Sequence, residues 1–335
     1  GSANRERRPH NRGRSPVSRA DGGQVPSVGE SVDKELPDAD FKLDLKNWVE
    51  YDVVDDLNGE WLPAELVTAS KIDELKAMYQ RRVWAEVPMS QCLAVTGQKP
   101  ISVRWVVHNK GDHESPNVRA RLVARHIREK YGGKDVDDLF AAMAPFEAVK
   151  LLLTKCVQSQ GKGRMRKLMF VDISKAHLYA PVDDDTAAYV DLPPECQKPG
   201  ICVRLNLWLY GMRPASRGWE NEYSRRLIDQ GFLRGKASPC CFYRKEDDLR
   251  CVVHGDDFVF EGDASRLREL ADNLSKHWIV KVRATLGPCA SDDKEVSVLN
   301  RIIRWESQCV LYEADPRHVE KLLREMEMED CKPVT

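Results

Sequence analysis

Two adjacent acids lie inside an apolar run in the segment CVVHGDDFVFEG, which spans residues 251–262. The other paired aspartates of the chain have polar neighbours that are typical of solvated turns, whereas Asp256 and Asp257 are flanked by valines and phenylalanines. These flanks should hold the turn against a packed sheet. Two carboxylates that are held close together and away from water repel each other, because an unpaired ionised carboxylate is costly to bury. A divalent cation would remove that cost.

A third acid, Asp172, ends the apolar strand predicted within KLMFVDISKAHLYA, residues 167–180. If the two strands are neighbours in one sheet, the three acids form an oxygen-rich site of the kind that Mg²⁺ prefers. Such sites serve phosphoryl transfer by two metal ions about 3.5 to 4 Å apart. Alternatively, Asp172 caps the helix that follows it, and GDD is an ordinary hairpin turn with Gly255 at a positive φ. Residue types and spacing alone leave both interpretations open.

The composition excludes few classes of protein. With 335 residues and a hydrophobic fraction of 42%, the chain can form a substantial core. The 52 basic and 53 acidic residues nearly cancel, so net charge indicates neither a nucleic-acid nor a membrane partner, although the basic segments 118–134 and 161–167 could bind a polyanion or simply be solvated. Ten cysteines without a CxxC pair indicate reduced thiols, so we expect an intracellular protein, cytoplasmic or nuclear. No apolar segment approaches the roughly 20 residues of a membrane span.

The elements that would position these residues follow from hydrophobic periodicity. Residues 1–40 are rich in Arg, Gly, Ser and Pro, which predicts a disordered basic tail. Strands mixed with helices, and antiparallel connections between strands, favour an α+β fold. In order, we predict a helix over 64–79 with Leu66, Ile72, Leu75 and Tyr79 on one face, a basic hairpin over 101–125, a short helix over 174–178, a strand over 187–192, a helix that Gly231 ends, a three-stranded meander over 241–262, a helix capped by Asp263, a strand pair formed by 295–305 with 309–314, and a final amphipathic helix capped by Asp315.

Seven segments, in this order, resemble the reverse transcriptase of copia-like long-terminal-repeat retrotransposons. They are VWAEVP, VRARLVARHIREKYGGKD, FVDISKAHLYA, YVDLPPEC, VRLNLWLYGMRPASRGW, VVHGDDFVF and KLLREMEMEDCKPVT, and they run from Val83 to Thr335. Each motif is weak by itself, but seven in the right order are specific. The resemblance implies a right-hand polymerase of α+β class, with an antiparallel palm sheet backed by helices.

The same resemblance implies a division of the chain. An N-terminal helical extension would occupy residues 41–82, the fingers 83–168, and the palm 169–290 with an interleaved fingers segment near 180–205. The primer-grip hairpin and the start of the thumb would occupy residues 291–335. Ribonuclease H, protease and integrase motifs are not found in the sequence, so we expect an isolated polymerase segment.

The resemblance also implies the site and its chemistry, which is RNA-directed and DNA-directed DNA polymerisation by two-metal nucleotidyl transfer. The partners would be a primed RNA or DNA template and a deoxynucleoside triphosphate. We expect catalytic acids at Asp172, Asp256 and Asp257, Mg²⁺ or Mn²⁺ held by these acids with the Ile173 carbonyl, nucleotide contacts at Arg119, Arg121, His177, Tyr210 and Gly211, and primer or template contacts at His254, Gly255, Leu299 and Asn300. Trp219 is expected in the core.

Four departures from the family pattern make activity uncertain from the sequence. His177 stands where the family has Phe, His254 with Gly255 replaces Tyr-Val, RPAS at 213–216 replaces KQAP, and Asn300 replaces a glycine. One alternative is therefore a catalytically inactive nucleic-acid-binding protein that keeps the fold. Another is an unrelated metal-dependent nucleotidyl enzyme with a similar sheet.

Overall fold

The computed structural model describes residues 53–112, 114–126, 141–160, 165–183, 186–307 and 309–331, all within one compact unit, Leu36–Thr335. The predicted tail, residues 1–40, lies outside the described residues, as do residues 127–134 of the basic segment and most of the segment 161–167.

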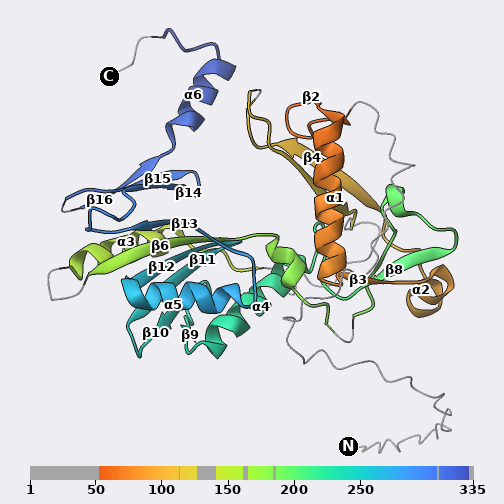
Figure 1. Cartoon of the computed structure of the whole chain (residues 1–335), viewed down its shortest axis with the longest axis horizontal. Helices are drawn as coiled ribbons and strands as arrows, with labels where there is room; N and C mark the ends of the chain where they lie inside the picture. The colour runs from red at the N-terminus through yellow and green to blue at the C-terminus, as the bar shows by residue number, and fades with distance from the viewer. Residues whose placement is uncertain are drawn as a thin grey trace, which may run out of the picture. The chain divides into compact units, whose positions relative to one another are not determined.

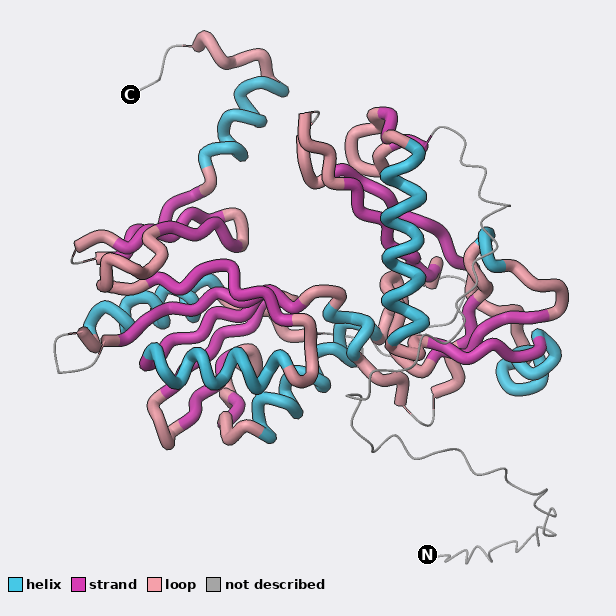
Figure 2. Tube along the Cα trace, in the orientation of Figure 1, coloured by secondary structure: helices cyan, strands magenta, loops and turns pink. Residues whose placement is uncertain are grey.

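A six-stranded antiparallel sheet forms the centre of the fold (Figures 1 and 2). Its strands β6 and β12 are buried along most of their length, because the sheet is covered on both faces. The predicted meander over 241–262 is confirmed, whereas sequence reasoning missed both edge strands. In spatial order the strands are β13 (Val280–Leu286), β6 (Arg166–Ile173), β12 (Asp257–Asp263), β11 (Leu249–His254), β10 (Cys241–Arg244) and β9 (Leu233–Arg234).

The two faces of this sheet pack against different elements. Met169, Val171 and Phe258 contact the core under α4 (Ala215–Asp229) and α5 (Ala264–Ser275). Leu168, Phe170 and Val259 contact α3 (Phe146–Gln158) and the small sheet of β14 to β16 on the opposite side, as Figure 1 shows. Side chains alternate between faces along a strand, so Asp172 and Asp257 belong to the second face.

The predicted helix ends in this region are confirmed. Asp263 accepts a hydrogen bond from the Ser265 amide at 3.1 Å and caps α5, and Gly231 follows α4 with a φ of +85°. Asp315 likewise caps α6 (Pro316–Glu325), accepting from the Arg317 amide at 3.0 Å. The apolar stripe of α6 is exposed among the described residues, with Val319, Leu322 and Met326 facing solvent.

A second group of elements surrounds helix α1 (Ala64–Gln80), which packs on the hairpin of β4 (Val103–Asn109) and β5 (Val118–Ala124). The predicted hairpin is confirmed. The predicted face of α1 is wrong at Leu66, which is exposed, because Lys71 and Glu74 are buried instead. The other elements of this group are β1 (Val53–Val54), β2 (Trp61–Leu62), β3 (Trp84–Pro88), α2 (Met89–Thr96), β7 (Tyr189–Val190) and β8 (Ile201–Leu205).

Ion pairs explain why two charged side chains of α1 are buried. Lys71 Nζ lies 3.2 Å from Glu195 Oε1, and Lys175 Nζ lies 2.6 Å from Glu74 Oε2. A prediction from hydrophobic periodicity leaves both charged residues out of the core, so it assigns the wrong face of α1 to the core.

One further prediction of local structure is wrong. Residues 295–305 are not one strand, because β14 (Glu295–Val298) and β15 (Arg301–Trp305) are joined by a turn at Leu299 and Asn300, with β16 (Val310–Ala314) as the third strand. Both turn residues have positive φ, 51° and 57°, as in a type I′ hairpin turn, where leucine is rare. The helical segment predicted over 174–178 is present as a single 3₁₀ turn, Ala176–Tyr179.

A buried ion pair joins β6 to β12 at the end of the sheet away from the acids. Arg166 Nε and Nη2 donate to the two carboxylate oxygens of Glu261 at 2.6 and 2.7 Å, and Arg250 Nη1 also donates to Glu261 at 2.7 Å. The Arg166 and Glu261 side chains are 2% and 0% exposed, so both charges are compensated by protein groups in place of water.

Candidate active site

The turn between β11 and β12 carries the adjacent acids. His254 pairs with Asp257 across it, and Gly255 takes the first central position with a φ of +67°, which suits the type II′ geometry favoured in hairpins. The Ile173 amide donates to the Asp256 carbonyl at 3.0 Å, and the Trp219 indole donates to the Gly255 carbonyl at 2.9 Å. Trp219 is buried in the core, as predicted, and it also fixes the turn.

Asp172 lies directly opposite Asp257 in the register of β6 with β12. The structure thus brings two of the three predicted acids together on one face, with Asp256 beside them in the turn. Asp172 does not cap the 3₁₀ turn that follows, which has no side-chain cap, so this part of the alternative is wrong. Its other part, a hairpin turn with Gly255 at a positive φ, is confirmed. Asp172 Oδ1 accepts a hydrogen bond from Arg283 Nη2 at 2.9 Å, and Arg283 Nη1 lies 3.5 Å from Asp257 Oδ1.

The electrostatics of Asp257 fit the predicted crowding of charge. Burial raises the pKa of Asp257 from its ordinary 3.8 to about 6, and the charges of Asp256 and Asp172 act in the same direction, whereas Arg283 and Lys110 oppose them. Asp257 Oδ1 is buried and has no hydrogen-bond partner. A carboxylate oxygen without a hydrogen-bond partner, close to two further carboxylates, is the kind of ligand that Mg²⁺ or Mn²⁺ binds.

The acids do not already form a closed metal cage. Among the residues that the structure describes, no three His, Cys, Asp or Glu side chains converge closely enough to hold an ion. The Arg283 guanidinium contacts two of the acids instead. Three carboxylates are ligands that a divalent cation binds, and their negative charge suits it. In this structure the Arg283 guanidinium compensates part of that negative charge.

A cavity of about 810 Å³ connects the acids to the basic hairpin. Asp172 and Asp256 line it from the sheet, and Arg119 and Arg121 line it from β5, where their alternate positions share one face while Ala120 and Leu122 are buried. The hairpin is thus positioned to place two guanidinium groups in the same cavity as the acids. Lys110, Tyr210, Lys281 and Arg283 also line this cavity, together with part of α1.

Three predicted nucleotide residues form one cluster. The ring centroids of His177 and Tyr210 are 5.3 Å apart, and the Arg121 guanidinium carbon lies 5.6 Å from the Tyr210 centroid. Burial lowers the pKa of His177, with Arg121 acting in the same direction and Asp256 opposing, so the imidazole is uncharged near neutral pH. A neutral imidazole is a flat ring, as the family's phenylalanine is, but it adds hydrogen-bonding atoms.

Gly211 holds this cluster against the hairpin. The Ala124 amide donates to the Tyr210 carbonyl at 2.7 Å, so the segment lies against β5. Gly211 has a φ of +78°, and a side chain there would clash with the Ala124 carbonyl oxygen and the Val123 side chain. Only glycine combines this backbone conformation with so close an approach.

The predicted primer and template residues divide into two places. His254 and Gly255 lie at the turn that carries the acids, and nothing lies within 4 Å of the position that a side chain on Gly255 would take. Leu299 and Asn300 form the β14–β15 turn, and Leu299 packs against the cluster that covers the acids' face of the sheet. Neither Leu299 nor Asn300 lines the cavity.

Sequence reasoning missed Lys110 and Arg283. Lys110 begins the connection of the basic hairpin, and its pKa is lowered by burial and by Arg121 and Arg119, while Asp256 and Asp172 raise it. Its position at the hairpin tip beside two arginines was a usable signal. Arg283 carried no such signal, because it reaches the acids from a strand that the sequence pattern did not predict.

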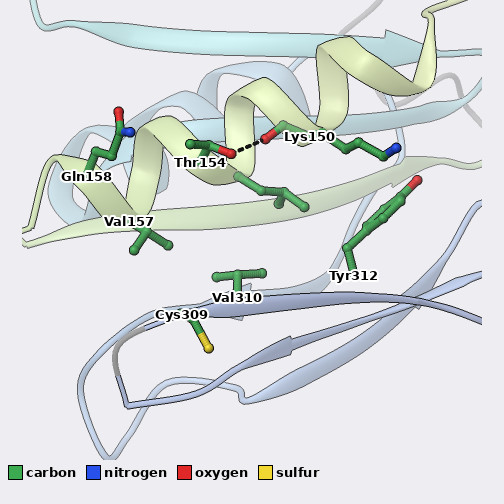
Figure 3. A pocket seen from close by; sticks show the side chains of 8 residues that line it. Lys150, Thr154, Val157, Gln158, Cys309, Val310 and Tyr312 are labelled. Carbon is green, nitrogen blue, oxygen red and sulfur yellow. Dashed lines mark hydrogen bonds between the residues drawn. The ribbon is translucent and has the colours of Figure 1, made fainter.

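A second hollow lies between α3 and β16 (Figure 3) and measures about 380 Å³. The Thr154 hydroxyl in its wall already donates to the Lys150 carbonyl at 2.8 Å. No carboxylate lines it, so it offers no site for a metal ion, and the candidate site is the cavity at the acids. Its lining is Lys150, Leu153, Thr154, Val157, Gln158, Cys309, Val310 and Tyr312.

The candidate site thus consists of opposed aspartates at the end of an antiparallel sheet, a third aspartate at the adjoining turn and a basic hairpin that lines the same cavity. The family model described as reverse transcriptase (RNA-dependent DNA polymerase) matches residues 89–291. The chain belongs to this family. The family match and the helix-backed antiparallel sheet confirm the predicted α+β polymerase fold.

Curated relatives confirm the similarity to copia-like elements. The chain is 24% identical over 249 residues to the retrovirus-related Pol polyprotein from transposon TNT 1-94 of Nicotiana tabacum, covering 71% of this chain and 18% of the relative. It is 24% identical over 270 residues to that from transposon RE1 of Arabidopsis thaliana, covering 78% and 17%. The chain therefore spans less than a fifth of either relative.

Solved structures with a related arrangement include a foamy viral protease-reverse transcriptase in complex with double-stranded DNA. It is 10% identical, has a TM-score of 0.43, and the match covers 79% of this chain and 37% of that one. Apo telomerase from Candida tropicalis is 8% identical with a TM-score of 0.41, covering 78% and 63%. Within the described ranges, no helix is both long and apolar enough to cross a membrane.

Proposed function

We propose that this chain extends a primer on an RNA or DNA template by adding deoxynucleotides to the primer 3′ hydroxyl. The observation that carries the proposal is that Asp172 and Asp256 line the same cavity as the basic residues Lys110, Arg119 and Arg121 of the hairpin. Acidic and basic residues that line one cavity can hold the two ends of a nucleoside triphosphate. In the reaction, the primer oxygen bonds to the α-phosphorus, the α–β phosphoanhydride bond breaks, and pyrophosphate leaves.

The roles of this chain's residues follow from their positions. Lys110, Arg119 and Arg121 bind the triphosphate as charge-assisted hydrogen-bond donors, and Arg offers the planar fork that suits phosphate oxygens. Tyr210 and His177 lie beneath the sugar and restrict its position. Gly255 presents a bare backbone at the turn, where the primer end can approach without meeting a side chain.

Asp172, Asp256 and Asp257, with the Ile173 carbonyl, would hold the divalent ions. Bound Mg²⁺ or Mn²⁺ activates a hydroxyl and stabilises the charge on the phosphates. The chain's own contribution is to keep the carboxylates in register through the β6–β12 pairing and to keep the turn in place through Trp219.

Primer extension on poly(rA)/oligo(dT) with Mg²⁺ or Mn²⁺ tests the proposal. Incorporation should be present in the wild type and fall by roughly 10³-fold or more in Asp256→Asn, since electrostatic stabilisation of this kind is commonly the largest catalytic contribution. Asp229→Asn, an exposed aspartate of α4, is the matched control and should keep its activity. Extension that survives in Asp256→Asn would overturn the proposal.

The alternative, an inactive nucleic-acid-binding protein, is favoured by one observation, the contact of Arg283 with two of the acids. It predicts salt-sensitive binding of a primed duplex without any incorporation. Consumption of nucleotides without a template would instead favour a template-independent nucleotidyl enzyme.

A further inference from the structure

Arg283 reaches the acids because of an irregularity in β13. This strand pairs regularly with β6 through Val282 and resumes at Ala284, so Arg283 is the extra residue of a β-bulge. Bulges change the direction in which a side chain points, and they are frequent next to active sites. Here the bulge directs a guanidinium group to Asp172 at 2.9 Å and toward Asp257 at 3.5 Å.

The burial of the three side chains shows which of them can move. The Arg283 side chain is 40% exposed, whereas Asp172 is 19% exposed and Asp257 is 15% exposed. Releasing the guanidinium into water costs only the ion pairs, which are weak at this exposure, and the cation gains hydration in return. The strand pairing fixes the carboxylates, so the Arg283 side chain is the partner that another cation can replace.

The contact with Asp257 is incomplete. At 3.5 Å it is an ion pair without a hydrogen bond, and Asp257 Oδ1 remains without a hydrogen-bond partner although it is buried. A smaller and more highly charged cation could satisfy this oxygen better than the guanidinium does. Arg283 therefore compensates the acids only in part, and Asp257 Oδ1 can still bind a cation more strongly.

We propose that Arg283 is the internal counter-ion of the metal site: in the ion-free protein it neutralises Asp172 and Asp257, and a divalent cation must displace it to bind there. This inference rests on the proposed function, because it concerns the same acids. It has two consequences. Arg283 raises the concentration of Mg²⁺ or Mn²⁺ that the protein requires, and it stabilises the protein in the absence of these ions.

Direct titration of Mn²⁺ tests this, with free Mn²⁺ followed by electron paramagnetic resonance on the full chain without nucleic acid. Arg283→Gln should tighten the apparent Kd roughly three- to tenfold, because the competing ion pairs are lost. Asp172→Asn in the Arg283→Gln background should abolish this gain. In EDTA, Arg283→Gln should also lower the Tm relative to the wild type.

Two control variants separate displacement from a general effect of charge. Lys281 lies opposite Asp172 in the register of β13 with β6, and Lys281→Gln removes one positive charge from the same strand. Arg283→Lys keeps the charge but lacks the two-armed donor. If the metal ion displaces Arg283, the apparent Kd for Mn²⁺ should fall clearly more in Arg283→Gln than in Lys281→Gln. Arg283→Lys should give an intermediate Kd.

The proposal is overturned if Arg283→Gln leaves Mn²⁺ affinity unchanged or weakens it, or if Lys281→Gln tightens it equally. Circular dichroism establishes that each variant is folded before titration. Primer extension by the wild type is a separate measurement. Extension with no Arg283 effect on Mn²⁺ affinity removes this inference alone, whereas an Arg283 effect without extension removes the polymerase proposal alone.

Discussion

At the scale of single residues, Arg121 connects the parts of the candidate site. Its guanidinium lies over Tyr210, its charge acts on His177 and Lys110, and it lines the same cavity as Asp256. The β5 pattern predicted its exposure on a strand, and the family resemblance predicted its ligand. Its position beside Tyr210 could not be predicted, because it depends on a contact between segments about 90 residues apart.

Replacing Arg121 should affect the nucleotide more than the duplex. Arg121→Ala should raise the KM for deoxynucleotides by roughly ten- to hundredfold, since hydrogen bonds to charged groups contribute about 1.5 to 3 kcal/mol. The affinity for primed duplex, measured by fluorescence anisotropy, should change far less. Arg104→Ala is the matched control, because Arg104 belongs to the same hairpin but is largely exposed and pairs with Asp56. A larger effect on duplex binding than on KM would remove Arg121 from the nucleotide site.

The raised pKa of Asp257 predicts how the stability of the protein depends on pH. The pKa of this carboxyl in the folded protein, about 6, lies above the ordinary value of 3.8, so the folded state binds this proton more tightly than the unfolded state. The resulting stabilisation is fully present below about pH 3.8 and is lost as the pH rises through about 6. The free energy of unfolding of the metal-free protein should therefore fall across this window.

Urea unfolding in EDTA between pH 4 and 8 measures this effect. The wild type should lose more stability between pH 4 and 7 than Asp257→Asn does, because the amide cannot ionise. Parallel pH profiles for the two proteins would show that Asp257 is not perturbed by its surroundings.

At the scale of elements, the segment of Tyr210 and Gly211 shows how one backbone contact positions several side chains. Gly211→Ala should destabilise the protein by about 1 to 3 kcal/mol, because the new methyl group meets β5 and the backbone is in the left-handed region. It should also raise the KM for deoxynucleotides, since Tyr210 moves with the segment.

Gly200→Ala separates conformational strain from this close approach. Gly200 has a φ of +73° but nothing within 4 Å of an added side chain. Chemical denaturation should show a smaller loss for Gly200→Ala than for Gly211→Ala, and nucleotide KM should be unchanged. Equal losses in the two variants would mean that contact with β5 contributes nothing.

Elements with strong apolar patterns were predictable, and short or irregular ones were not. The meander and the Asp263 cap follow from local sequence, because alternation and capping are local effects. The face of α1 was misassigned because buried ion pairs with Glu195 and Lys175 are non-local. Strand β13 begins VKVR, where charged residues interrupt the pattern, since part of it is an exposed edge.

At the scale of the whole molecule, one hydrophobic core links both groups of elements. It contains Leu75 of α1 and Leu122 of β5 together with Phe258 of the central sheet and Leu270 of α5. Helix α3 also packs on β6, β11 and β12, so we propose that the palm begins before residue 146 and not at 169.

A shared core predicts cooperative unfolding. Differential scanning calorimetry of the full chain should show a single transition for residues of both groups, with calorimetric and van't Hoff enthalpies in agreement. Tryptophan fluorescence and far-ultraviolet circular dichroism should give the same midpoint. Two resolved transitions would show that the hairpin group and the sheet unfold separately.

The buried pair of Arg166 and Glu261 has a consequence for the distant acids. A strand that slips by one residue exchanges its faces, which would carry Asp172 away from Asp257. The same slip would separate the buried Arg166 guanidinium from Glu261, which leaves a charge in the interior without this partner, so the misaligned sheet is destabilised at its far end. The alignment of Asp172 with Asp257 therefore depends in part on a pair of side chains at the other end of the sheet, and a mutation of Arg166 or Glu261 should disturb the two acids from a distance.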